Sequence, residues 1–167
     1  MGARPSRAQA GPAALTVKKA RFFGRDRDVR DASGVVGRIL FSRDFATATV
    51  VVRGERYEVF RLHLRLKKGG EEVMSSVEAK GVYSKLTTDY MGRRYVMEYI
   101  SSGWVVRCGV QEVGRLSRRW LRFGEGVPLL LQVHLLWYTL LPDVALAVRA
   151  LDITRMYAGA RKIGYCN

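Results

Sequence analysis

The segment from Val127 to Leu141, VPLLLQVHLLWYTLL, limits the possible folds of this chain more than any other feature. It contains no charged residue, and Pro128 stands where a proline suits the first turn of a helix. Apolar residues occupy every side of such a helix, and a helix that is apolar all round is buried in a membrane or in a protein core. The run is about 15 residues long, whereas a helix needs about 20 apolar residues to cross a bilayer. We therefore expect a helix buried inside the protein.

The rest of the chain has the pattern of short β-strands. TATVVV at 47–52 and RYEVFRLHLRLK at 56–67 are rich in β-branched and aromatic residues, and Arg53-Gly54-Glu55 separates them as a turn would. From Leu62 onward apolar and polar residues alternate, which predicts a strand that buries Leu62, Leu64 and Leu66 on one face. Turn signals recur about every 8–12 residues, the spacing of an all-β sandwich or barrel. A closed barrel would surround an apolar helix on all sides.

We therefore predict an all-β dominated (β+α) fold, an antiparallel β-meander closed into a barrel around a buried hydrophobic C-terminal helix. A length of 167 residues with 48% hydrophobic residues suits one domain with a real core. The expected organisation is a disordered lead at 1–14, a single domain at 15–157 with its central helix at 127–141 and a further helical segment at 143–157, and a tail at 158–167.

A membrane anchor is the alternative for the apolar segment. After Pro142, VALAVRALDI adds further apolar residues but brings in Arg149 and Asp152. The two interpretations predict different effects on solubility and folding when the chain from Val127 onward is removed. Removal of an anchor leaves a soluble protein, whereas removal of a core helix exposes the apolar lining of the barrel to water.

Three stretches share nearly the same phrase: GVVGRIL from Gly34, GGEEVMS from Gly69 and QEVGRL from Gln111. A turn followed by a returning strand explains them, so we expect three hairpins of one type. Gly37 and Gly114 occupy matching places, where a glycine allows a β-bulge or a close approach of another chain segment. The arginine that follows each of them is expected to point to solvent.

The order of these features resembles the tubby C-terminal-like superfamily, especially its LURP-one-related branch and its phospholipid scramblase relatives. DVRDASGVVGRILF resembles the early hairpin, DYMGRRYVMEY the Gly-Arg-x-Tyr strand, and QEVGRLSRRW followed by the apolar run and Asp152 the strand that leads into the central helix. The likeness extends from about Lys18 to Asp152, and the chain departs from the family pattern at Pro142. The resemblance implies a twelve-stranded closed barrel threaded by a hydrophobic helix, in a family whose members bind phosphoinositides or act at membranes.

No catalytic set is evident in the sequence. The histidines, His63 and His134, stand on an alternating segment and in the apolar run, where a hydrogen-bonded core histidine is the commoner outcome. Cys108 and Cys166 are far apart and form no C-x-x-C, which argues against a zinc site and a disulfide framework. The carboxylates lie mostly among arginines. We predict a protein that is not an enzyme, with no metal and no cofactor.

The strongest functional signal is positive charge, since the net charge is +14. A domain this basic attracts nucleic acid, anionic lipid or an acidic protein. Arginine and lysine gather with aromatic residues in VKKARFFGRDR and in RLSRRWLRF. We predict that these clusters form an anion-binding site: Lys18, Lys19, Arg21, Arg115, Arg118, Arg119, Arg122 and Trp120. On a strand, Arg118 and Trp120 would share one face. Alternatively, the arginines are merely solvated and Trp120 points into the barrel.

The sequence thus favours a non-catalytic module that docks on anionic phospholipid through basic residues, as the resemblance also implies. Nucleic-acid binding and a protein-interaction scaffold are the alternatives, since the same charge serves each of them. The N-terminal residues contain no apolar run typical of a signal peptide, so we expect a cytoplasmic protein, peripheral to the membrane if it binds lipid. The oligomeric state stays open.

Overall fold

A computed structural model describes residues 14–21, 24–79, 82–100 and 103–163. The lead predicted to be disordered lies outside the described residues except for Ala14. The elements follow in chain order: β1 (Leu15–Lys19), β2 (Arg27–Asp31), β3 (Gly34–Phe41), β4 (Thr47–Val52), β5 (Glu55–Phe60), β6 (Arg65–Lys68), β7 (Glu71–Ala79), β8 (Val82–Tyr90), β9 (Arg93–Ile100), β10 (Gly103–Cys108), β11 (Gln111–Leu116), β12 (Trp120–Phe123), α1 (Leu129–Thr139) and α2 (Pro142–Ile163).

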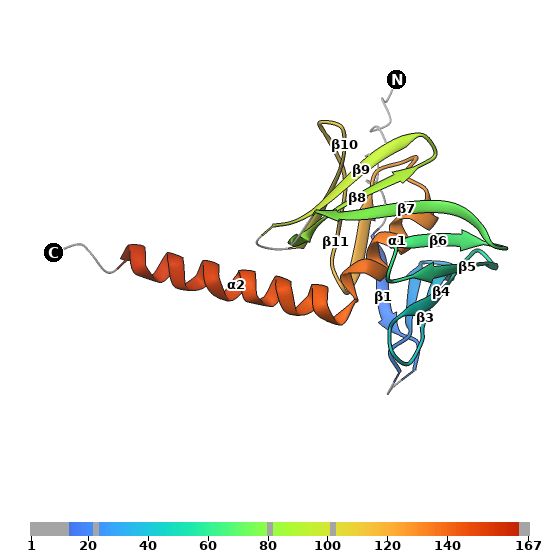
Figure 1. Cartoon of the computed structure of the whole chain (residues 1–167), viewed down its shortest axis with the longest axis horizontal. Helices are drawn as coiled ribbons and strands as arrows, with labels where there is room; N and C mark the ends of the chain where they lie inside the picture. The colour runs from blue at the N-terminus through green and yellow to red at the C-terminus, as the bar shows by residue number, and fades with distance from the viewer. Residues whose placement is uncertain (1–13, 22–23, 80–81, 101–102, 164–167) are drawn as a thin grey trace, which may run out of the picture.

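The twelve strands form a closed antiparallel barrel in which each strand pairs with its neighbours in sequence. The barrel closes where β1 pairs with β12, with Leu15 opposite Leu121 and Thr16 opposite Trp120. Figure 1 shows the strands wrapped around α1 and the long helix α2 projecting away from them. The predicted meander barrel around a buried helix is confirmed.

The core is made by the inward faces of the strands and by α1. In β4 the side chains of Ala48, Val50 and Val52 are buried and alternate with more exposed ones, as a strand with one apolar face requires. Nearly all of α1 is buried, with Leu131, Leu136 and Trp137 fully so. The absence of charge in the apolar segment is therefore explained by the barrel that surrounds it.

The helical part is divided differently from the prediction. α1 covers only 129–139 of the expected 127–141, and α2 begins at Pro142 and continues through Ile163, so the tail predicted from 158 is helical over most of its length. Pro142 cannot donate a backbone hydrogen bond, which breaks the helix but suits the first turn of the next one. The backbone N–H of Ala145 donates to the carbonyl of Leu141 at 3.0 Å.

By length and hydropathy, no single helix among the described residues qualifies as a membrane span. The helices α1 and Pro142–Met156 of α2 qualify only when taken together, and they are bent by 70° where they meet.

The three repeated sequence stretches form three hairpins, and each hairpin contains a register shift at the same position after its turn. In β2–β3, β6–β7 and β10–β11 the first two residues after the turn pair normally, and then the register shifts. The residue left without a partner is a valine in each hairpin: Val36, Val73 and Val113. Such β-bulges increase the local twist of a strand, which helps a sheet to close into a barrel.

The two glycines of the phrase follow this bulge, and each leaves room for a neighbour. A Cβ atom on Gly37 would lie 3.0 Å from Val133 Cγ2, so this glycine lets α1 approach the barrel wall. A Cβ on Gly114 would lie 2.2 Å from Cδ1 of the Phe123 ring, which covers the backbone at this point. The third hairpin has the buried Met74 at the same place.

One predicted strand is wrong. The segment 56–67 is interrupted by a turn at 61–64, so that Leu62 is 84% exposed instead of buried. Leu64 has a φ of 48°, in the left-handed region that glycine normally occupies. The turn lets β5 and β6 pair as antiparallel neighbours, and Leu64 and Leu66 remain buried.

We predict that Gly114→Ala destabilises the protein by about 1–3 kcal/mol, because the new methyl group overlaps the Phe123 ring. Gly124→Ala is the matched control, since its nearest neighbour is 3.7 Å from the Cβ position. Urea denaturation measures both. Adding Phe123→Leu to Gly114→Ala should recover part of the loss, and purely additive effects would contradict the proposed overlap.

We also predict that a chain ending at Gly126 does not form the barrel, because the inward faces of the strands would lose the helix that fills them. Near-UV circular dichroism and gel filtration would report lost tertiary structure or aggregation. A soluble, cooperatively folded fragment would mean that α1 is dispensable for the barrel.

Candidate functional site

One end of the barrel, here called the exit end, brings the chain ends of several strands to the place where α1 ends and α2 begins. β1 ends there at Lys19 and β2 begins at Arg27, which are opposite each other in the pairing of the two strands. β12 begins at this end, since the backbone N–H of Val17 donates to the carbonyl of Arg119 at 2.7 Å. Basic residues from distant parts of the sequence therefore meet at one place.

Strand pairing connects the two segments that contain the basic clusters predicted from the sequence. β1 carries Lys18 and Lys19 and pairs with β12, and β12 pairs with β11, where Arg122 lies opposite Arg115. All eight predicted residues are exposed at the surface. We call this surface the basic face: Lys18, Lys19, Arg21, Arg115, Arg118, Arg119, Trp120 and Arg122. Phe22 and Phe23, which accompany the first cluster in the sequence, lie outside the described residues.

Trp120 belongs to the outer surface. Its side chain is 36% exposed, whereas Leu121 and Phe123 on the same strand point inward and are buried. The interpretation with an inward Trp120 is therefore wrong. The guanidinium carbon of Arg122 lies 6.0 Å from the centroid of the Trp120 ring, within the range of a cation–π contact.

Arg118 and Arg119 are not on a strand, contrary to the prediction. They belong to the connection between β11, which ends at Leu116, and β12, which begins at Trp120. The Ser117 hydroxyl accepts a hydrogen bond from the backbone N–H of Arg119 at 3.2 Å. The connection therefore holds both arginines at the exit end of the barrel.

The arginines of the basic face differ in how far their charge is already neutralised. Arg115 makes two hydrogen bonds to Glu112, with Nε 2.6 Å from Oε1 and Nη2 3.1 Å from Oε2. Among the described residues, no ion pair is formed by Arg118, Arg119 or Arg122. These three arginines are therefore better placed than Arg115 to bind an external anion.

Arg118 has positive rather than negative neighbours. Burial lowers the pKa of its guanidinium, and the charges of Arg149 and Arg27 lower it further. Burial also lowers the pKa of Arg27. A bound anion would relieve the repulsion of Arg118 by Arg27 and Arg149, because it adds an attraction between opposite charges.

Arg149 was not among the predicted site residues. It lies on α2, and it reaches this place because α2 leaves the barrel at the exit end. Two contacts fix this helix: Arg61 pairs with Asp143 in its first turn, and the Tyr99 hydroxyl donates to Asp152 Oδ2 at 2.7 Å. Burial, together with the Asp152 hydrogen bond, raises the pKa of Tyr99 to about 12, so this donor stays protonated at neutral pH.

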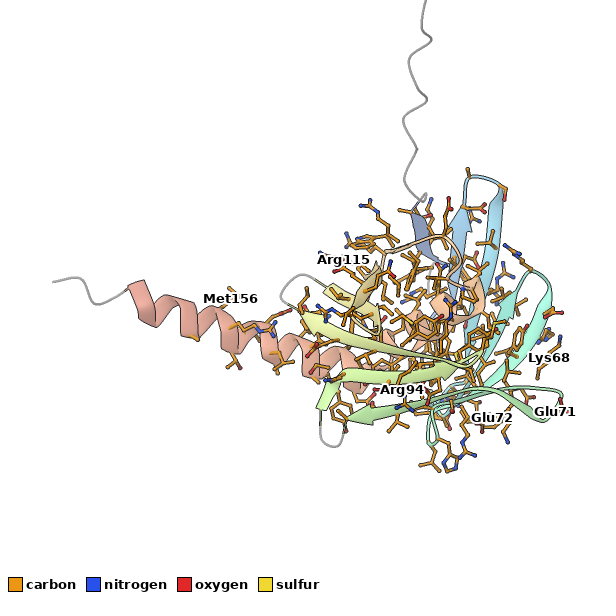
Figure 2. The ribbon with its side chains drawn as sticks, turned by 90° about the horizontal axis from the view of Figure 1, so that it is seen from above. Lys68, Glu71, Glu72, Arg94, Arg115 and Met156 are labelled. Carbon is orange, nitrogen blue, oxygen red and sulfur yellow. The ribbon has the colours of Figure 1, made fainter. Side chains whose placement is uncertain are left out.

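Acidic residues occur on several sides of the barrel, and Glu112 lies on the same strand as Arg115. Figure 2 shows Glu71 and Glu72 on the side away from α2, whereas Arg115 lies toward the side from which α2 and its Met156 project. Lys68 lies on the same side as Glu71 and Glu72, and Arg65 pairs with Glu72, so both signs of charge occur there.

His134 lies inside the barrel, in a chain of polar contacts. Its Nε2 is 2.9 Å from the Ser76 hydroxyl, which is 2.7 Å from the Thr88 hydroxyl. Burial lowers the pKa of His134 to about 4, so the ring is neutral at pH 7. All three residues are at most 5% exposed, so a substrate has no access to this serine–histidine pair.

The described part of the chain contains no group of three or more His, Cys, Asp or Glu residues that could hold a metal ion. Cys108 is a free cysteine, and Cys166 lies outside the described residues. Comparison of the chain with protein-family models, curated proteins and solved structures finds no match.

We predict that His134 makes the protein less stable in mild acid. The unfolded chain takes up a proton at His134 near pH 6.5 and the folded protein only near pH 4. The full stability is therefore present above pH 6.5 and falls by about 1.4 kcal/mol per pH unit below it, about 3 kcal/mol in all. Urea denaturation between pH 7 and pH 4, compared with His134→Leu, measures this contribution. Parallel curves for the two proteins would contradict it.

Proposed function

We propose that this chain is a non-catalytic binding module of the tubby-like, LURP-one-related type that docks on anionic phospholipid through the basic face. The observation that carries the proposal is the meeting of two basic clusters from distant parts of the sequence beside the exposed Trp120. Arginine suits phosphate oxygens, and tryptophan suits the interface between headgroups and acyl chains.

Exposed apolar side chains on α2 support a lipid partner over a nucleic acid. Leu146, Ile153 and Met156 are 65%, 54% and 75% exposed. With Arg149 they follow the spacing of one helix stripe. A helix that combines apolar and basic residues on one stripe can lie in the headgroup region of a bilayer. Nucleic acid offers no comparable apolar partner to this stripe.

The architecture is consistent with the family resemblance. A closed twelve-stranded barrel with an apolar helix at its centre is what the order of the motifs implies, although the helix breaks at Pro142. We propose that the module is non-catalytic. Among the described residues, a serine hydroxyl contacts a histidine ring at Ser76 and His134, and this pair is enclosed in the core. A peripheral position at the cytoplasmic side of a membrane follows from this role.

Sedimentation with liposomes tests the proposal. We expect the detergent-free protein to pellet with vesicles that contain phosphatidylserine or phosphoinositides, but not with neutral vesicles, at physiological salt. Arg118→Gln with Arg119→Gln should reduce pelleting at least about tenfold, because both arginines lack a carboxylate partner among the described residues. Arg115→Gln should have a smaller effect, since Glu112 already neutralises Arg115.

The matched control is Arg56→Gln with Arg93→Gln, which changes the net charge equally at exposed positions outside the basic face. Equal losses in the control and in the Arg118/Arg119 variant would mean that net charge alone drives binding. Failure to pellet at physiological salt by a folded protein would overturn the lipid proposal. Tight, salt-sensitive binding to DNA or RNA under the same conditions would then favour the nucleic-acid alternative.

A further inference from the structure

A cavity of about 290 Å³ lies at the exit end, between the barrel and the first turns of α2. Residues from β9, β10, the connection between β11 and β12, the end of α1 and α2 line it. Its volume is close to the small end of ligand pockets, about 300 Å³. The elements that enclose it are held together by the contacts of Arg61 with Asp143 and of Tyr99 with Asp152.

The inner part of the cavity is apolar and aromatic. Trp104 is 4% exposed and makes edge-to-face contacts with Tyr99 at 5.3 Å and Tyr138 at 6.0 Å between ring centroids. Ala145 and Val148 of α2 add aliphatic surface on the other side. The aromatic rings and aliphatic side chains present mainly apolar surface, so this part suits an alkyl group.

The rim of the cavity is positively charged. Arg118, Arg119 and Arg149 line it together with Ser117. Asp152, on the same helix as Arg149, accepts the hydrogen bond of Tyr99, and none of the three arginines forms an ion pair among the described residues. A ligand that enters here meets guanidinium groups first and apolar side chains beyond them.

We propose that this cavity binds one anionic amphiphile, with the charged head on Arg118 and Arg149 and the first part of the alkyl chain against Trp104, Ala145 and Val148. The head is a phosphate or a carboxylate, which arginine binds with paired hydrogen bonds. The inference deepens the proposed function, because it adds a stoichiometric site for a single molecule to the docking of a surface. The amphiphile comes either from a bilayer or from solution, and the test separates the two sources.

Isothermal titration calorimetry with octyl phosphate, below its micelle concentration, tests the cavity without a membrane. We expect one site per chain. Inorganic phosphate lacks the alkyl chain and octyl glucoside lacks the charge, so each should bind at least about tenfold more weakly.

Two variants address the two halves of the cavity. Ala145→Leu fills the apolar part without changing the charge, and Arg118→Gln with Arg149→Gln removes the charge from the rim. Each should weaken octyl phosphate binding at least about tenfold, whereas Arg56→Gln with Arg93→Gln should leave it within about twofold. Thermal melts by circular dichroism confirm that each variant is folded.

Liposome sedimentation of Ala145→Leu distinguishes this inference from the proposed function. Loss of octyl phosphate binding with retained pelleting supports the cavity as a separate site beside the basic face. One-site binding by a wild-type protein that does not pellet supports the cavity with an amphiphile from solution, and overturns membrane docking. Equal binding of octyl phosphate and octyl glucoside, or unchanged binding in Ala145→Leu, overturns the cavity proposal whatever the vesicles show.

Discussion

The structure depends on one mutual constraint between α1 and the strands. A barrel of about eight strands can fill its own interior with side chains, but twelve strands enclose a wider space. An apolar helix fills that space, and a helix without charge on any side has no other place in water. The strands and α1 cover each other's apolar surface, so the hydrophobic effect acts on both through a single interface.

The basic face is a consequence of the same constraint. Its two halves come from the first strand and the last one, and they meet only because the barrel closes between β1 and β12. The closing pair is held by the core behind it, where Val17, Leu121 and Phe123 are buried. The basic face and the core are therefore two sides of the same seam, and loss of the core would separate the halves of the basic face.

The sequence allows the core to be predicted better than the surface, for physical reasons. The uncharged run at Val127–Leu141 and the alternation in TATVVV follow directly from burial, which acts on each residue separately. The repeated Val-Gly phrase predicts a bulge because backbone pairing is local. The turn at Leu62 could not be predicted in this way, since it contains no glycine and the alternation of apolar and polar residues continues through it.

The site needs information that local patterns do not contain. Alternation gives two possible directions for Trp120, and only the burial of Leu121 and Phe123 in the folded barrel shows that Trp120 is outward. Arg149 joins the basic residues because α2 turns by 70° after α1, which depends on packing as well as on Pro142. Among the basic residues at the exit end, Lys19, Arg118 and Arg119 could be proposed from the sequence, whereas Arg149 on α2 required the fold.

Because α1 follows all twelve strands in the sequence, it also affects how the chain folds during synthesis on the ribosome. Every strand emerges before the helix that fills the barrel, and the partner of β1 is the last strand to be made. Until then the nascent chain holds a row of strands with an unpaired edge at each end and an open apolar face, which are features that promote aggregation. Only the late arrival of α1 lets the seam close, so protection of the growing chain is most needed just before synthesis of this domain is complete.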